Sequence, residues 1–267
     1  MSAQDRADPS TVTRNIASDR PMRSEGSVVG WVLSVYPEAG EAGGSFRYAR
    51  QPVRSPGGVP DPERSAAEAA RRARGKLRRY CAANRLNRLG TLTYAGDGCH
   101  DPGELRSHLA GFFRQLRRLN GGQAFPYVWV PEWHHTDHGL HAHFAIGQFI
   151  KRSLIEAAWG HGFVHIKLLG DLPHGAGSLE EARKGAAYLS KYVAKAIDDR
   201  RIPRHHRYDV AQSFQPAQHG VWGATADDAI AAASTQFMGG RWPVYQWSSD
   251  QQPDWKAPPS VWVSWAG

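Results

Sequence analysis

Cysteine, long apolar runs and acidic residues are all scarce in this chain of 267 residues. The only cysteines are Cys81 and Cys99, which argues against a disulfide framework and is typical of a reducing compartment. No apolar run is long enough to span a bilayer, and the initial Met-Ser-Ala-Gln-Asp has no apolar core of a secretory leader. We therefore expect a cytoplasmic protein that does not bind membranes.

The shortage of acidic residues leaves 25 Asp and Glu against 33 Lys and Arg, a net charge of +8. Residues 64–88 contain nine basic residues and a single acidic one, Glu68. The segment 65–80 is typical of a basic helix capped by Ser65, with Glu68 at the reciprocal position. Such a helix can be an ordinary solvated face, but the patch as a whole favours contact with DNA phosphates. The residues assigned to DNA binding are Arg71, Arg72, Arg74, Lys76, Arg78 and Arg79.

Two histidines lie in the run Leu140–Ile146, whose alternation predicts a strand. His141 and His143 are two apart, so they project from the same face of that strand. A preceding strand at 127–131 and the turn residues 136–139 predict a hairpin that brings Glu132 beside them. Two imidazoles and a carboxylate suit Mn²⁺ or Mg²⁺ with open positions better than a closed structural zinc site. The alternative is a polar hairpin in a His-rich chain.

Four other histidines lie near this hairpin. His134, His135 and His138 are close enough in sequence to replace Glu132, but their positions are typical of loop histidines. His165 falls in a later predicted strand, where a hydrogen-bonded structural histidine is the more usual interpretation.

Two tyrosines and two lysines are paired along the predicted helix 179–197. Tyr188 and Tyr192 are four residues apart, as are Lys191 and Lys195, so each pair shares a helical face. A free phenol ionises only near pH 10, roughly, and a nearby metal and lysines would favour the nucleophilic phenolate. The alternative is that both tyrosines pack in the core while the lysines are solvated.

The order of these motifs resembles that of the HUH-superfamily endonucleases, in particular the rolling-circle replication initiators of plasmids and phages. The matching segments are Gly90-Thr-Leu-Thr-Tyr94, His141-Ala-His143 and Tyr188-Leu-Ser-Lys191. The tyrosine follows the histidines, whereas relaxases of the same superfamily carry it ahead of them. The resemblance covers about residues 88 to 197.

The resemblance implies a role for each matching residue. His141 and His143 correspond to the metal-binding pair, and Glu132 to a third ligand from the neighbouring strand. Tyr188 corresponds to the nucleophile and Lys191 to its supporting base or phosphate clamp. Tyr192 with Lys195 repeats that pattern one turn later. This repeat is compatible with a two-tyrosine enzyme, and equally with a single nucleophile beside a packing tyrosine.

The implied activity is metal-dependent nicking and rejoining of single-stranded or hairpin origin DNA through a 5′-phosphotyrosine, with no nucleotide cofactor. A host helicase or polymerase is a possible further partner. A transposase of the same superfamily would share the site. A basic DNA-binding module without catalysis, with a structural or zinc-binding His-rich hairpin, is the alternative from a different functional class.

The sequence pattern predicts an α+β fold with a central antiparallel sheet and helices on one face, which leaves the other face for metal and DNA. Residues 1–60 are expected to be largely disordered or loosely structured, except for a possible strand at 28–36. Residues 61–203 are expected to form the endonuclease domain. Its further elements are strands at 89–94 and 163–169 and helices at 104–119 and 153–159, with Leu105, Leu109, Phe112, Leu116 and Leu119 buried.

The segment 204–267 holds six of the ten tryptophans, interleaved with Pro and Gly. Tryptophans can stack on the bases of single strands, but this pattern is more typical of anchors in a loop-rich extension.

Overall fold

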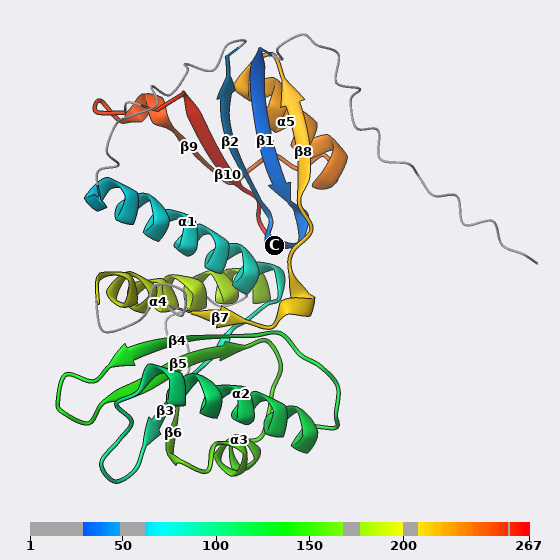
Figure 1. Ribbon diagram of the computed structural model, residues 1–267. Helices are drawn as coiled ribbons and strands as arrows, with labels where there is room; N and C mark the ends of the chain where they lie inside the picture. Colours follow the sequence, from blue (N-terminus) through cyan, green and yellow to red (C-terminus); the bar gives the residue numbers. More distant parts are fainter. Residues whose placement is uncertain (1–28, 49–61, 168–176, 200–207, 256) are drawn as a thin grey trace, which may run out of the picture.

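The computed structural model describes residues 29–48, 62–167, 177–199, 208–255 and 257–267. Within these ranges the chain forms two five-stranded antiparallel sheets and five α-helices (Figure 1). The lower sheet has the order β6-β3-β5-β4-β7 and the upper sheet the order β8-β1-β2-β10-β9. The predicted α+β class with an antiparallel sheet is therefore confirmed.

The lower sheet contains β3 (Arg88–Tyr94), β4 (Tyr127–Trp133), β5 (Leu140–Ile146), β6 (Gly162–Lys167) and β7 (Asp209–Val210). Four of these strands match the predicted ones to within a few residues. Alternate residues of β5 explain why it lies at the centre, because Phe144 and Ile146 face one core and Ala145 faces another.

Helices cover both faces of the lower sheet. On one face lie α2 (Pro102–Leu119) and α3 (Arg152–Trp159), whose buried side chains Phe112 and Trp159 pack around Phe144. On the other face lies α4 (Ser178–Asp198), which packs in turn against α1 (Pro62–Ala83) (Figure 1). The expected open face is thus covered by α4, because that helix has its own apolar stripe to bury. The metal-ligand candidates lie beneath it.

Two details of the predicted helices need correction. Helix α1 begins at Pro62, so Ser65 lies inside the helix rather than at its N-cap; proline is favoured in the first helical turn. Leu119 is the last residue of α2 and is exposed, whereas Phe113 is buried and stacks on Tyr127 with 3.6 Å between ring centroids.

The upper sheet joins residues from both ends of the chain. It contains β1 (Gly30–Tyr36), β2 (Glu41–Arg47), β8 (His219–Gly223), β9 (Tyr245–Ser248) and β10 (Ser260–Ser264). Helix α5 (Ala226–Phe237) packs on one face over a core that includes Leu33, Val263 and Trp265. A capping box of Thr225 and Asp228 begins this helix. The remaining short elements are the 3₁₀ turns η1 (Pro37–Ala39), η3 (Gln212–Phe214) and η4 (Ser249–Gln251).

This sheet corrects the expectations for both ends. Residues 30–47 are not loosely structured, since both strands there are fully paired. Residues 209–265 are not a loop-rich extension, because they supply three strands and a helix to the same sheet. Neither segment alternates strongly enough to predict this pairing. The expected disorder of residues 1–27 falls outside the described residues.

A buried carboxylate connects the upper sheet to the helices below it. Glu41 is almost fully buried, and it accepts two hydrogen bonds from Arg78, at 2.9 Å and 3.1 Å. Arg79 lies 3.6 Å from the same carboxylate. Arg183 of α4 donates to the backbone oxygens of Gly40 and Trp265. These contacts hold the two sheets on opposite sides of the α1–α4 layer (Figure 1).

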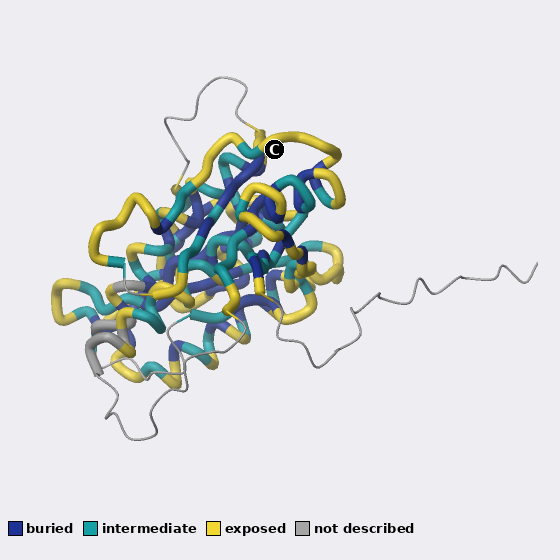
Figure 2. The backbone as a smooth tube through the Cα atoms, turned by 90° about the horizontal axis from the view of Figure 1, so that it is seen from above, coloured by how far each residue is buried: buried dark blue, intermediate teal, exposed yellow. Residues whose placement is uncertain are grey.

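Figure 2 shows the buried segments running through the middle of the molecule, with exposed loops outside them. Both cysteines are buried and free, as expected. No helix in the described part of the chain is both long and apolar enough to cross a membrane.

Candidate metal and nucleophile site

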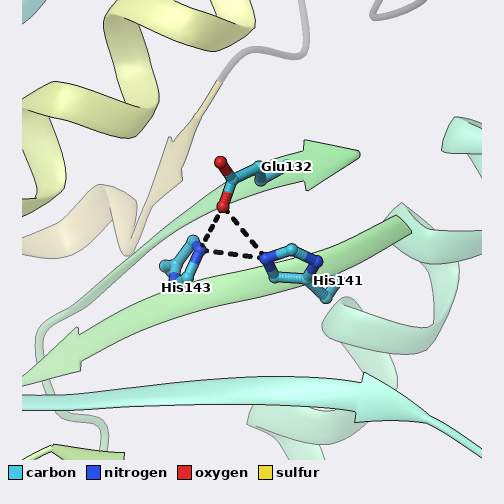
Figure 3. A group of neighbouring side chains, drawn as sticks. All are labelled: Glu132, His141 and His143. Carbon is cyan, nitrogen blue, oxygen red and sulfur yellow. Dashed lines mark hydrogen bonds and ion pairs between the residues drawn. The ribbon is translucent and has the colours of Figure 1, made fainter. Parts of the chain in front are cut away.

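The three predicted metal ligands meet at one point on the lower sheet. Glu132 on β4 pairs in register with His141 on β5, and His143 lies two residues further along the same face. One carboxylate oxygen, Oε2 of Glu132, lies 3.0 Å from Nε2 of His141 and 2.8 Å from Nε2 of His143. The two Nε2 atoms are 3.1 Å apart. Figure 3 shows the three side chains pointing toward one another.

This donor set fits a divalent metal ion. Ligand atoms at about 2.1 Å from an ion lie roughly 3.0 Å apart at right angles and roughly 3.4 Å apart at tetrahedral angles. The observed separations of 2.8 to 3.1 Å match the right-angled arrangement of octahedral ions. Hydrogen bonding alone satisfies the triangle poorly, because both imidazoles cannot donate to Glu132 and also accept from each other. Within the described residues, Glu132, His141 and His143 are the one group with metal-ligand spacing.

The strand β3 orients one of the imidazoles. Oγ1 of Thr91 lies 3.0 Å from Nδ1 of His143, so a proton on Nδ1 leaves the Nε2 lone pair free for an ion. Nδ1 of His141 is buried without a hydrogen-bond partner. Thr91 pairs in register with His143 on one side and with His165 of β6 on the other.

Charge and burial keep this site in its ligand form. Burial alone would raise the pKa of Glu132, but hydrogen bonds from His141, His143 and Lys195 outweigh it and hold that pKa well below its usual range. Burial lowers the pKa of His143, and its hydrogen bond to Glu132 opposes the shift only in part. The site therefore offers a carboxylate and a neutral imidazole at neutral pH, as metal ligands require.

A pocket of about 310 Å³ opens beside the triad. Lys195 of α4 reaches across it and donates to Oε1 of Glu132 at 2.6 Å. The pocket lining includes Glu132, Trp133, His135, His141, Lys195, Ala196 and Asp199. A basic side chain at the edge of this pocket is suited to an anionic substrate.

Helix α4 places the tyrosines over the triad because of its sequence spacing. Its buried residues recur every three or four positions, as in a helix that packs on one face. They are Leu179, Ala182, Ala186, Leu189, Val193 and Ala196. Tyr188 and Tyr192 flank this stripe and are half-buried. The ring of Tyr192 stacks on His143 with 3.7 Å between centroids, and the ring of Tyr188 lies 6.4 Å from His143.

The two phenols are not equivalent. Oη of Tyr192 donates to Oη of Tyr188 at 2.6 Å, so the Tyr188 oxygen is the acceptor. Burial, and then this hydrogen bond, raise the pKa of Tyr192 above its ordinary value. Nζ of Lys167 lies 3.9 Å from the centroid of the Tyr188 ring. A hydrogen-bond donor and a cation thus both favour negative charge on Tyr188.

The other predicted residues lie at varying distances from the triad. Lys191 is exposed on α4, while Lys195 is part of the site. His134 is hydrogen-bonded to Thr136, and its ring centroid lies 5.5 Å from that of His141. His138 is hydrogen-bonded to the backbone oxygen of Tyr94. Their contacts are those of loop histidines, and the third donor of the triad is Glu132.

The basic residues of α1 divide into two groups. Arg71, Arg72, Arg74 and Lys76 are exposed. Arg78 and Arg79 instead contact Glu41, and the Arg78 guanidinium lies 4.7 Å from the Trp262 ring. The latter pair therefore has a structural task that the charge count did not reveal.

Two residues near the site were not predicted from the sequence. Thr91 lies in the Gly-Thr-Leu-Thr strand that carried the resemblance, but its contact with His143 depends on pairing with a strand some fifty residues away. Lys167 ends β6 on the face that α4 covers. Its alternation with Val164 and Ile166, which face the opposite core, is the signal that could have found it.

Comparison with known families gives an independent result. Residues 87–197 match the family of the replication-associated protein ORF2. This segment contains the triad, both tyrosines and Thr91, and it coincides with the resemblance predicted for residues 88 to 197. The match supports a role in replication initiation and, more generally, nuclease chemistry on DNA. No curated protein and no solved structure matches the chain.

Proposed function

We propose that this chain, whose residues 87–197 match the replication-associated protein ORF2 family, is a metal-dependent endonuclease that nicks and rejoins single-stranded origin DNA. The observation that carries the proposal is the position of the Tyr188–Tyr192 pair over the triad Glu132, His141 and His143. A nucleophile beside a metal-ligand set is the arrangement that phosphoryl transfer requires.

The triad would hold Mg²⁺ or Mn²⁺, which supplies Lewis-acid polarisation of a phosphate oxygen when bound. Glu132 fixes the relative positions of both imidazoles, and Thr91 fixes the tautomer of His143. Lys195 places a positive charge at the pocket, where it attracts the DNA backbone.

Tyr188 is the proposed nucleophile. Its Oη forms a bond to the phosphorus while the bond from phosphorus to the 3′-oxygen breaks, which leaves a tyrosyl 5′-phosphodiester and a 3′-hydroxyl. The phenolic proton is transferred in the net reaction to the 3′-oxygen. Tyr192 supports the developing charge through its hydrogen bond to Tyr188. Because one phosphodiester replaces another, rejoining is the reverse reaction and needs no nucleotide cofactor.

The substrate is proposed to be a single strand or the exposed strand of a hairpin. Half-buried tyrosines under α4 are out of reach of a phosphate within a stacked duplex, whereas a flexible single strand can enter the pocket. Origin DNA of the replicon that encodes the chain is the natural candidate, and a host helicase or polymerase would use the freed 3′-end. The protein would act in the cytoplasm.

The test is to incubate the purified chain with labelled single-stranded DNA from its own replicon, with Mn²⁺, Mg²⁺ or EDTA. We expect a covalent adduct that mass spectrometry locates on Tyr188, and that is lost with EDTA. Tyr188→Phe should lose this adduct but keep DNA binding, and Lys184→Ala, on an exposed position of the same helix, serves as the matched control.

Two outcomes would redirect the assignment. DNA binding without any metal-dependent adduct would favour a non-catalytic module with a structural His-rich hairpin. Adducts only with the terminal sequences of a mobile element would favour a transposase of the same superfamily.

A further inference from the structure

The two faces of the upper sheet differ sharply in burial. The face toward α5 is closed, with Leu33, Val35 and Val263 fully buried. Residues that alternate with them point to the opposite face, and most of these are only half-buried or exposed. From β8 to β9 they include Trp222, Gly220, Val32, Ser34, Gly43, Ser45, Ser260, Trp262, Trp247 and Tyr245. We call this set the open face.

The open face has aromatic side chains at both edges and small ones between them. Trp222 lies on the edge strand β8 and is 52% exposed. Tyr245 lies on the opposite edge strand β9, is 54% exposed, and packs 5.6 Å from Trp262. Gly43 and Ser45 lie between these edges, so no large side chain rises from the centre. Planar rings can therefore approach the sheet and stack on its aromatic margins.

Helix α1 supplies positive charge along the lower border of this face. The Arg78 guanidinium lies 4.7 Å from the Trp262 ring, and that of Arg79 lies 4.5 Å from Tyr36. Arg74 and Arg71 precede Arg78 by one and two helical turns, so they continue the same side of α1. Both are exposed.

We propose that the open face, together with Arg71 and Arg74, binds single-stranded DNA as a second contact region outside the nicking site. Aromatic rings without base-specific donors stack on any base, and arginines beside them neutralise the backbone. This combination distinguishes a strand-binding surface from an apolar docking face, which would lack the cations. The proposal concerns binding alone and does not require that the site at Tyr188 cleaves DNA.

The open face is a large part of the upper sheet, yet within the described residues only the end of α1 contacts it, through Glu41, Trp262 and Tyr36. Trp265, by contrast, is fully buried and hydrogen-bonded on the α5 side. Nε1 of Trp262 is buried without a hydrogen-bond partner, although a buried indole usually has one. A strand across this face would bring acceptor oxygens near that donor.

The experiment measures the affinity of the full-length chain for a fluorescein-labelled oligothymidine by anisotropy, in EDTA. We expect Trp222→Ala and Tyr245→Ala each to weaken binding about tenfold. Arg71→Ala and Arg74→Ala should each lower the slope of log affinity against log salt by about one. Tyr48→Ala is the matched control, because Tyr48 is 49% exposed in the same sheet but packs on Phe46 of the opposite face.

Unchanged affinity in both Trp222→Ala and Tyr245→Ala would overturn the proposal, whether the face then holds another part of the chain, a second copy or a protein partner. Circular dichroism verifies that each variant is folded. Photocrosslinking of the unmodified chain to bromouracil-substituted DNA gives a second, mutation-free readout. Crosslinked peptides from β8, β9 or β10 support the proposal, and crosslinks confined to residues 87–197 contradict it. Adduct formation at Tyr188 is scored separately, so the two proposals can fail independently.

Discussion

Replacing Tyr192 with Phe isolates the hydrogen bond between the two phenols. The substitution removes the hydroxyl that donates to Tyr188 at 2.6 Å, while the ring that stacks on His143 stays in place. The Tyr188 oxygen gains negative charge during attack, so the donor stabilises the transition state more than the ground state.

The size of the effect follows from the type of bond. A hydrogen bond to a charged acceptor contributes about 1.5 to 3 kcal/mol, against about 0.5 to 1.5 kcal/mol for a neutral one. The difference between the two states, with a discount because both tyrosines are partly solvated, is about 1 to 2 kcal/mol. We therefore expect adduct formation to slow by roughly 5 to 30-fold.

The assay is single-turnover adduct formation on one oligonucleotide with Mn²⁺, and Tyr188→Phe is compared in parallel. A wild-type rate in Tyr192→Phe would refute the supporting role of its hydroxyl. A fast adduct on Tyr192 in the Tyr188→Phe variant would show that the second phenol is itself a nucleophile, as in a two-tyrosine enzyme.

Three further predictions concern single contacts. Thr91→Val should weaken Mn²⁺ binding by about 10 to 100-fold in calorimetry, because His143 loses the partner that fixes its tautomer, and Thr91→Ser should retain most of the affinity. Glu41→Gln should lower the free energy of unfolding by about 2 to 3 kcal/mol in urea, below the usual cost of a broken buried pair because Arg78 keeps some solvent contact; an unchanged midpoint would contradict this. Burial raises the pKa of the Cys81 thiol to about 12, so a disulfide reagent at neutral pH should label it only after unfolding, and rapid labelling of the native chain would argue against its burial.

The lower sheet and its site could be predicted from the sequence because their signals are local. The strand Leu140–Ile146 alternates clearly, the turn before it contains Gly139, and Glu132 is nine residues from His141. A hairpin therefore determines the triad without knowledge of the rest of the fold. The relation of α4 to the sheet came from the family resemblance, since no local pattern specifies which face a helix covers.

The upper sheet could not be predicted because its pairings are distant and its strands are irregular. β2 reads Glu-Ala-Gly-Gly-Ser-Phe-Arg, which has no strand-like alternation. Gly44 is needed there because a Cβ atom would collide with the backbone oxygen of Val32. Strand β1 pairs with β8, some 190 residues later in the chain. The capping box of Thr225 and Asp228 was a local signal for α5 that the sequence analysis did not use.

The pairing of both chain ends in one sheet determines the order in which the protein can be completed during synthesis. The nuclease segment is inserted, in sequence, between β2 and β8. Until β8 and β10 emerge from the ribosome, β1 and β2 form at most an isolated hairpin with Leu33 uncovered, and such a hairpin is marginally stable. A prematurely terminated chain would thus carry the tyrosines and the triad but lack a closed upper sheet. Exposed apolar strands of this kind are what cellular quality control recognises, so intact synthesis and an assembled second sheet become a single requirement.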